Sequence, residues 1–289
     1  MTAQAKIHKN FYTVTQRILD LIDKGILPWQ QPWMDIKYQN LIGQKPYSGI
    51  NPSICQLDCL LFGYTSPYFI GMAQCRERDW KIKKSSKSTW LRYGGTRKIV
   101  KEKEGREVET YVNTFKWLQV FNLDCIDDGQ SETKIADCIP QVKDVTPSDR
   151  EPQMQQLVEN SNAAIVYGGN RAYYIPSLDE VHLPHRYQFS CSDRFWAVMF
   201  HELGHWTGAE VRLNCTLGTE KDSDEYCFEE LVADLTSSFL GYEFDLEGTQ
   251  LEHHASYLRH YWRLLKSDPK LFFKASFEAQ KAATYLLEG

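Results

Sequence analysis

The pattern His-Glu-x-x-His occurs at His201, Glu202 and His205, and it is the feature that most constrains the fold of this 289-residue chain. The pattern lies in an apolar run between Ser192, a candidate N-cap, and Gly208, a candidate stop. Because residues four positions apart share one face of a helix, the two imidazoles can bind a single metal ion with Glu202 beside it. The sequence therefore predicts a helix that carries a metal site.

The same three residues predict a reaction. Zinc held by three protein ligands keeps a fourth position for water and lowers the pKa of that water to about 7. Glu202 could then act as general base and help to deliver hydroxide to a carbonyl carbon, so amide hydrolysis is the expected chemistry. Zinc is the expected metal, and another divalent metal such as manganese is compatible with these ligands. The alternative is that His201 and His205 are hydrogen-bonded core residues without a metal.

The third metal ligand must come from another segment, and residues 226–240 are the best candidate because they read as a second amphipathic helix. Glu229 and Glu230 are adjacent there, so only one of them can face the metal. We expect Glu230 to be the ligand, because Asp234 then follows one turn later and could orient a ligand histidine through its second ring nitrogen. The alternative for these acids is a solvated helix face.

The composition is that of a globular protein, with 42% hydrophobic and 25% charged residues. No apolar run is long enough to span a membrane, and residues 1–6 lead into a polar segment without a signal-peptide core. We therefore expect a cytoplasmic protein with no membrane partner. The eight cysteines include no Cys-x-x-Cys pair and are expected to be thiols.

Charge divides the chain into two parts. Residues 1–122 hold 19 lysines and arginines against 10 aspartates and glutamates, a net charge of +9, which leaves −14 for the remainder. This division predicts a binding half and a catalytic half. The polar, acidic stretch 124–150 is expected to be a mobile linker between a domain at 1–123 and a domain at 151–289.

Both domains are expected to be α+β. Apolar residues at helical spacing predict a helix over 11–22, and Asn51-Pro52 predicts the start of another. The strands predicted in the first domain are 89–92, 98–101, 108–112 and 115–121, with turns at Gly94-Gly95 and Gly105. The second domain is predicted to contain strands 163–167, 171–175 and 180–183, followed by four helices. Residues 179–183 are the expected edge strand, which could pair with an extended peptide.

The region from Arg76 to Lys98 carries nine cations and two acids, with Trp80, Trp90 and Tyr93 among them. Single-stranded nucleic acids are bound by such a mixture, because cations follow the phosphates and aromatic faces stack on unpaired bases. The candidate DNA-binding residues are Lys81, Lys83, Lys84, Lys87, Trp90, Arg92, Arg97 and Lys98. The alternative is an ordinary basic hairpin whose tryptophans belong to the core.

Further motifs are distributed along the whole chain. In the first part they are Gly25 with Pro28-Trp29 and Pro32-Trp33, Tyr47 to Asn51, Gly63-Tyr64 with Ser66-Pro67, and Ala73-Gln74. In the second part they are Gly168-Gly169, Ala172 to Pro176, His201 to Gly208, Arg212 to Asn214 and Glu229 to Ala233. With these motifs the chain resembles, from end to end, the ArdC-type antirestriction proteins of conjugative plasmids, whose N-terminal domain is shared with TraC-like plasmid primases.

This resemblance implies an N-terminal domain that binds single-stranded DNA, a C-terminal zincin-like metallopeptidase domain, and a role in protecting incoming plasmid DNA from restriction. It implies single-stranded DNA and either a protein substrate or a restriction enzyme as partners. The chain departs from the family in two places: Lys84 to Lys87 replaces a Lys-Gly turn, and Asp234 stands where Glu is common. The alternative function is a non-catalytic protein whose metal is structural and which coats single-stranded DNA or contacts the restriction enzyme.

Overall fold

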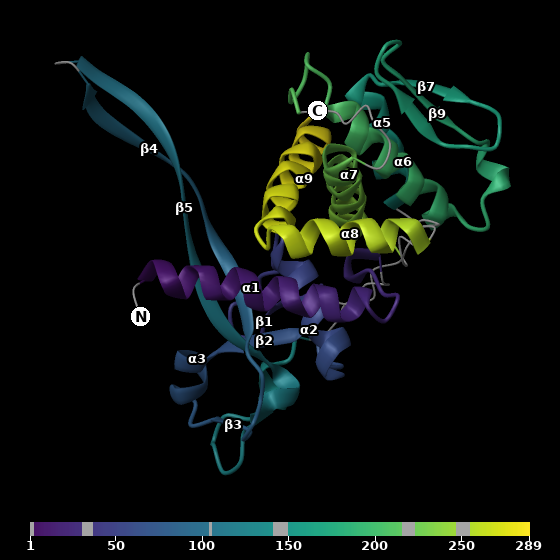
Figure 1. The fold of residues 1–289 in the computed structure, drawn as a ribbon. Coiled ribbons are helices and arrows are strands. Elements are labelled where there is room, and N and C mark those ends of the chain that lie inside the picture. The colour runs from purple at the N-terminus through teal and green to yellow at the C-terminus, as the bar shows by residue number, and fades with distance from the viewer. Residues whose placement is uncertain (1–2, 31–36, 104–105, 141–149, 216–222, 247–254) are drawn as a thin grey trace.

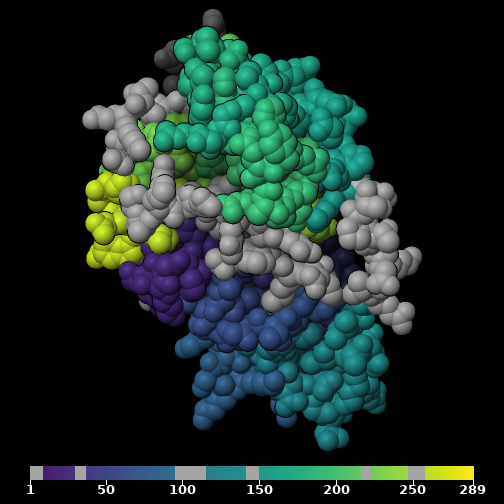
Figure 2. Space-filling model, turned by 90° about the vertical axis from the view of Figure 1, so that its right-hand side faces the viewer, coloured from purple at the N-terminus to yellow at the C-terminus, as the bar shows by residue number. Residues whose placement is uncertain are grey.

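The structure is a computed structural model that describes residues 3–30, 37–103, 106–140, 150–215, 223–246 and 255–289. The N-terminal half lies against the C-terminal half, and a long two-stranded ribbon projects away from the body (Figure 1). In the side view, the purple and blue N-terminal residues lie below the green C-terminal residues (Figure 2). Within the described ranges, no helix has both the length and the apolar character needed to cross a membrane.

The N-terminal half combines helices with a mixed four-stranded sheet. β1 (Gln39–Asn40) runs parallel to β2 (Tyr68–Gly71), and β2 and β4 (Thr89–Lys103) both pair antiparallel with β5 (Arg106–Asn122). The helices are α1 (Ala3–Ile22), α2 (Asn51–Phe62) and the short α3 (Met72–Arg76). α2 begins at Asn51-Pro52 as predicted and ends at Gly63, whose φ of 69° favours glycine.

The turn predicted at Gly94-Gly95 is wrong. Both glycines lie within β4, where Gly94 pairs with Phe115 and Gly95 with Thr114 on β5. Two long strands therefore replace four short ones and form the projecting ribbon (Figure 1). Glycine inside a strand permits a bend or a close approach of another group without ending the ladder, which is why the pair was misleading as a turn signal. The turn predicted at Gly105 lies outside the described residues.

The linker predicted over 124–150 is wrong in its first part. β6 (Ile126–Asp127) pairs antiparallel with β3 (Lys81–Ile82), so this segment is folded onto the N-terminal half. Cys125 and Ile126 are buried in a small core with Trp80, whose indole N–H donates to the carbonyl of Thr133 at 2.7 Å. Cys125 and Ile126 hold this segment in the core, although Ile139 further along is exposed, and the overall composition of the stretch does not reveal which residues are buried. Residues 141–149 lie outside the described part.

The C-terminal half contains the predicted small sheet followed by four helices. The strands are β7 (Ala164–Tyr167), β8 (Tyr173–Ile175) and β9 (Glu180–Leu183), in the order β7-β9-β8. The helices are α5 (Arg150–Ser161) before the sheet and, after it, α6 (Ser192–Thr207), α7 (Asp224–Glu243), α8 (Ala255–Ser267) and α9 (Leu271–Glu288). The predicted edge strand is wrong, because β9 is central, with Val181 and Leu183 fully buried, and β8 is an edge.

The two halves share one hydrophobic core. Phe11 of α1 packs edge-to-face on Phe273 of α9 at 4.7 Å between ring centroids. The Thr15 hydroxyl donates to the carbonyl of Pro269 at 2.8 Å, and α1 lies beside α8 (Figure 1). The charge boundary in the sequence is therefore not a boundary between independently packed bodies.

Candidate metal centre

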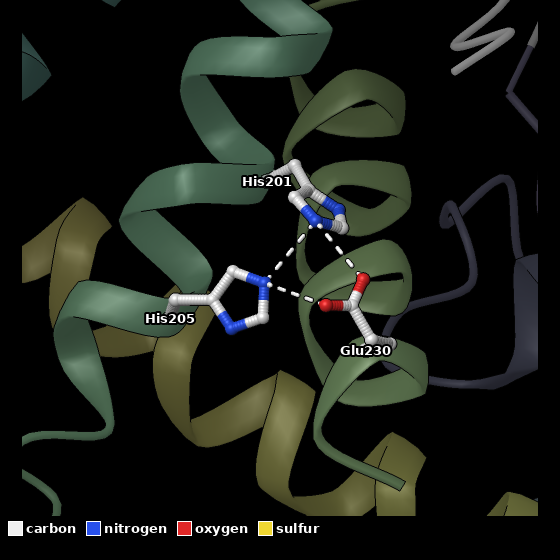
Figure 3. Close-up of side chains that lie close together, drawn as sticks. All are labelled: His201, His205 and Glu230. Carbon is white, nitrogen blue, oxygen red and sulfur yellow. Dashed lines mark hydrogen bonds and ion pairs between the residues drawn. The ribbon is translucent and has the colours of Figure 1, made fainter. Parts of the chain in front are cut away.

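The centre forms where α6 and α7 pack closely against each other. α6 presents His201 and His205 one turn apart, and α7 presents Glu230 opposite them (Figure 3). Gly204 allows this approach, because a Cβ at that position would lie 3.0 Å from the Cα of Ala233. The glycine between the two histidines therefore fixes how near Glu230 can come.

The three side chains converge on one point. His201 Nε2 lies 3.2 Å from His205 Nε2, and these atoms lie 3.6 and 3.7 Å from the Glu230 carboxylate oxygens, respectively. Two nitrogens bound to one tetrahedral zinc at ordinary bond lengths are about 3.3 Å apart. The nitrogen and carboxylate donors therefore fit a divalent metal ion in number, kind and spacing.

Each histidine has a carboxylate beside its other ring nitrogen. His201 Nδ1 lies 3.1 Å from Asp234 Oδ1, so Asp234 is beside the ring nitrogen of His201 that faces away from Glu230, and His205 Nδ1 lies 2.7 Å from Glu229 Oε1. Such partners orient an imidazole and select which nitrogen carries the proton. The contact between Glu229 and His205 Nδ1 was not predicted from the sequence, where Glu229 and Glu230 were considered only as alternatives for one ligand position.

Asp234 is itself held from both halves of the chain. The Tyr261 hydroxyl donates to Asp234 Oδ2 at 2.8 Å, and the Trp29 indole N–H donates to the same oxygen at 3.4 Å. The Asp234 side chain is fully buried. Trp29 follows Pro28 at the start of a short 3₁₀ helix in the N-terminal half, and no sequence signal relates it to the centre.

Burial and charge set the protonation of the centre. Burial alone would lower the pKa of His201, but the contacts with Asp234 and Glu230 outweigh it and raise that pKa well above its ordinary value. Burial opposes ionisation of Glu230, yet His201 and His205 lower its pKa to about 2. Glu230 is therefore an anion at neutral pH and is available to a cation.

Glu202 lies in the same buried region but makes different contacts. Burial raises its pKa, while the neighbouring imidazoles of His201 and His205 act in the opposite direction. The backbone N–H of Tyr174 donates to its carboxylate, so edge strand β8 lies beside Glu202. Arg212 tethers this strand to the end of α6, because its guanidinium donates to the hydroxyl of Tyr174 and its Nε to the carbonyl of Trp206.

The predicted DNA-binding residues lie in two regions. Lys81, Lys83, Lys84 and Lys87 are exposed around β3 and the loop after it, at the end of the molecule away from the metal centre (Figure 1). Trp90 and Arg92 are half-buried on β4. Arg97 and Lys98 belong to the ribbon, with side chains outside the described part. Trp80, which sequence analysis counted among the possible stacking residues, is buried and unavailable to a base.

Comparisons with known proteins agree with this two-part organisation. Residues 8–121 match the family model of the N-terminal domain of anti-restriction factor ArdC, and residues 152–278 match the model of a zincin-like metallopeptidase. The chain is 28% identical over 312 residues to a DNA primase TraC of Escherichia coli, covering 98% of this chain. It spans 27% of that primase and 19% of a second TraC primase, so it corresponds to a fraction of those proteins.

Two crystal structures of the antirestriction protein ArdC from plasmid R388 are similar over nearly the full length. The metal-free structure is 29% identical with a TM-score of 0.71, over 96% of each chain. The Mn(II)-bound structure is 30% identical with a TM-score of 0.72, over 96% of this chain and 97% of that one. The α+β, two-domain fold is confirmed, and the chain belongs to the ArdC family of antirestriction proteins, with a zincin-like domain built to hold a divalent metal.

Proposed function

We propose that this protein binds single-stranded DNA through its N-terminal half and hydrolyses a peptide bond at its metal centre, and so protects incoming plasmid DNA from restriction in the cytoplasm. The observation that carries the proposal is the convergence of His201, His205 and Glu230, with Glu202 beside them. His201, His205 and Glu230 are the metal ligands, and Asp234 and Glu229 orient the two imidazoles. Zinc is the proposed metal, and Mn(II) is the ion in the similar R388 protein.

A divalent ion at this site would supply Lewis acidity toward water and a carbonyl oxygen. Glu202 is the proposed general base, because its pKa is raised by burial and a base of higher pKa accepts a proton more readily. The same carboxyl group can then return the proton to the leaving amine. The peptide is proposed to lie along β8, because the Tyr174 N–H points at Glu202 and the strand's free edge therefore faces the centre.

Support for DNA binding comes from charge. Lys81, Lys83, Lys84 and Lys87 form an exposed basic cluster in a half whose net charge is +9. Clustered cations bind phosphates by releasing counterions, and they need no fixed geometry to do so. The match of residues 8–121 to the ArdC N-terminal domain, and the likeness to TraC primases, make DNA the favoured polyanion.

A second candidate function is supported by how deeply the centre is enclosed. His201, Glu202 and Glu230 are all buried, as expected for a metal that braces a fold. In that case protection would come from coating DNA or from contacting the restriction enzyme, without proteolysis.

The pair of wild type and Glu202→Gln separates the two candidates. The substitution keeps the shape of the side chain and the three proposed ligands, so metal content and folding should stay unchanged. Transfer of unmodified plasmid DNA into a restricting recipient is then measured with each protein. Loss of protection of the plasmid DNA by Glu202→Gln supports catalysis. Full protection would contradict the peptidase proposal and favour a structural role for the metal.

A further inference from the structure

A pocket of about 640 Å³ lies where the base of the β4–β5 ribbon meets α9. Its walls come from residues 45–51, from Arg92 to Gly94 on β4, and from Phe277 and Gln280 on α9. Gly49 has a φ of 64°, and a Cβ there would lie 3.1 Å from the Gln280 side-chain oxygen. The loop that contains Gly49 therefore packs closely against α9 of the C-terminal half at the edge of this pocket.

The charge of this pocket favours an anion. Lys45 and Arg92 line it, and none of its described lining residues is acidic. Another pocket, beside His205, is lined by four acids, including Glu229 and Glu278, and by two lysines. Residues 1–122, which supply most of this lining, hold 10 acids as well as 19 bases, so the absence of acids from the described lining is a local feature.

Arg92 is held in place before any ligand arrives. Its guanidinium lies 4.4 Å from the ring centroid of Phe115, and its backbone N–H and C=O both bond to the side-chain amide of Asn51, at 2.8 and 3.0 Å. A preorganised cation loses little conformational entropy on binding. Arg92 is therefore suited to a fixed contact with a phosphate, unlike the exposed lysines around β3.

The remaining walls suit a flat ring. Tyr93 and Phe115 are half-buried in the lining, and Phe277 is 37% exposed although it is a large apolar side chain. Aromatic faces beside cations are the combination that binds an unpaired base together with its phosphate. An anionic ligand with an aromatic ring, of a size that fits this volume, is a nucleotide.

We infer that this pocket holds one unpaired nucleotide of a bound single strand, with the base against Phe277 and Tyr93 and the phosphate near Lys45 and Arg92. The inference rests on the single-strand binding proposed above. It adds that α9, which belongs to the peptidase half, forms part of the DNA site. The strand would then run from the lysines around β3 to the junction of the two halves.

The test uses the full-length protein and a fluorescent dT15 oligonucleotide, with affinity measured by anisotropy over a range of salt concentrations. Phe277→Ala should weaken binding about tenfold and leave the salt dependence unchanged, because stacking releases no counterions. Lys45→Gln changes an exposed residue that does not endanger folding, and should reduce the slope of log K against log salt by about 0.7. Tyr285→Ala is the matched control, since Tyr285 lies on the same helix with the same 37% exposure but outside the pocket.

A cross-linking measurement checks position independently of affinity. An oligonucleotide carrying one 5-iodouracil should cross-link to the peptide that contains Phe277 or to the one that contains Tyr93. If wild type binds dT15 while Phe277→Ala and Lys45→Gln bind equally well, the pocket assignment is overturned and single-strand binding stands. No binding by wild type would overturn both. If dTMP alone competes as strongly as the oligonucleotide, the pocket is a site for free nucleotides, and its assignment to the strand fails.

Discussion

The indole nitrogen of Trp29 lies 3.4 Å from Oδ2 of Asp234, although 205 positions separate the two residues in the chain. The other oxygen of Asp234 lies 3.1 Å from His201 Nδ1. One carboxylate thus joins the N-terminal half to the side chain that we propose as a metal ligand. The metal centre is therefore expected to respond to changes in the N-terminal half, which we propose binds DNA.

Trp29→Phe should weaken metal binding by several-fold to about tenfold, because Asp234 loses one of the donors that fix it behind His201. Affinity is measured by competition with a chromogenic chelator. Trp80→Phe is the matched control, since it also removes a buried indole donor in the N-terminal half, but one that bonds to Thr133. Equal metal affinity in both variants would show that the Trp29 contact does not act on the centre.

Glu230→Gln should remove most of the bound metal, whereas Glu229→Gln should lower affinity only about 10- to 100-fold, the usual effect of losing a partner behind a ligand. The two residues are adjacent but contact different atoms: Glu230 faces both Nε2 atoms and Glu229 faces His205 Nδ1. Elemental analysis of the purified variants decides. Retained metal in Glu230→Gln with loss in Glu229→Gln would mean that the ligand assignment is reversed.

Metal affinity should fall as the pH drops from 8 to 6. Carboxylates around His201 and His205 outweigh the effect of burial and raise both pKa values above the ordinary 6.5 of histidine. A bound imidazole must be neutral, so protons compete with the metal at each pH below these raised values, by up to about tenfold per pH unit for each proton. Glu230, with a pKa of about 2, stays ionised in this range. Chelator competition at pH 8, 7 and 6 measures the effect, and a constant affinity would contradict it.

Gly204→Ala should destabilise the protein by about 1 to 3 kcal/mol, because the added methyl would lie 3.0 Å from the Ala233 backbone and push α6 from α7. The same displacement should reduce metal affinity by moving Glu230 away from the histidines. Urea unfolding and chelator competition measure the two effects. Gly71→Ala serves as the control, since its methyl would meet only the Gln74 side chain, at 3.4 Å. A Gly204→Ala protein as stable as this control would argue against close packing at the centre.

Reversing the charge of Lys84 and Lys87 should weaken binding of single-stranded DNA and flatten its salt dependence, because each lost phosphate contact removes a slope of about 0.7. Both lysines are exposed in the loop between β3 and β4. Titrations of the full chain between low and moderate salt give the slope. Reversing Lys274 on α9, also exposed but outside the pocket there, is the control, and an equal loss in it would mean that the effect is not local.

The helix that carries His201 and His205 could be predicted because the spacing of two ligands on one helix is a local property. The preference for Glu230 over Glu229 came from Asp234 one turn later, and that spacing is local as well. Trp29 could not be related to Asp234, since their contact depends on how α1 and the following turn pack on α7 and α8. The turn predicted at Gly94-Gly95 was wrong for the same reason, because pairing with β5 determines the backbone conformation there and the local composition does not.

The packing of Phe11 on Phe273 has a consequence for fragments of this protein. A gene fragment cut at the charge boundary would encode two pieces, each with an uncovered aromatic surface. The two halves are therefore expected to be stable only when both are present. The TraC primase is consistent with this, because the region that it shares with this protein covers 98% of this chain and 27% of the primase.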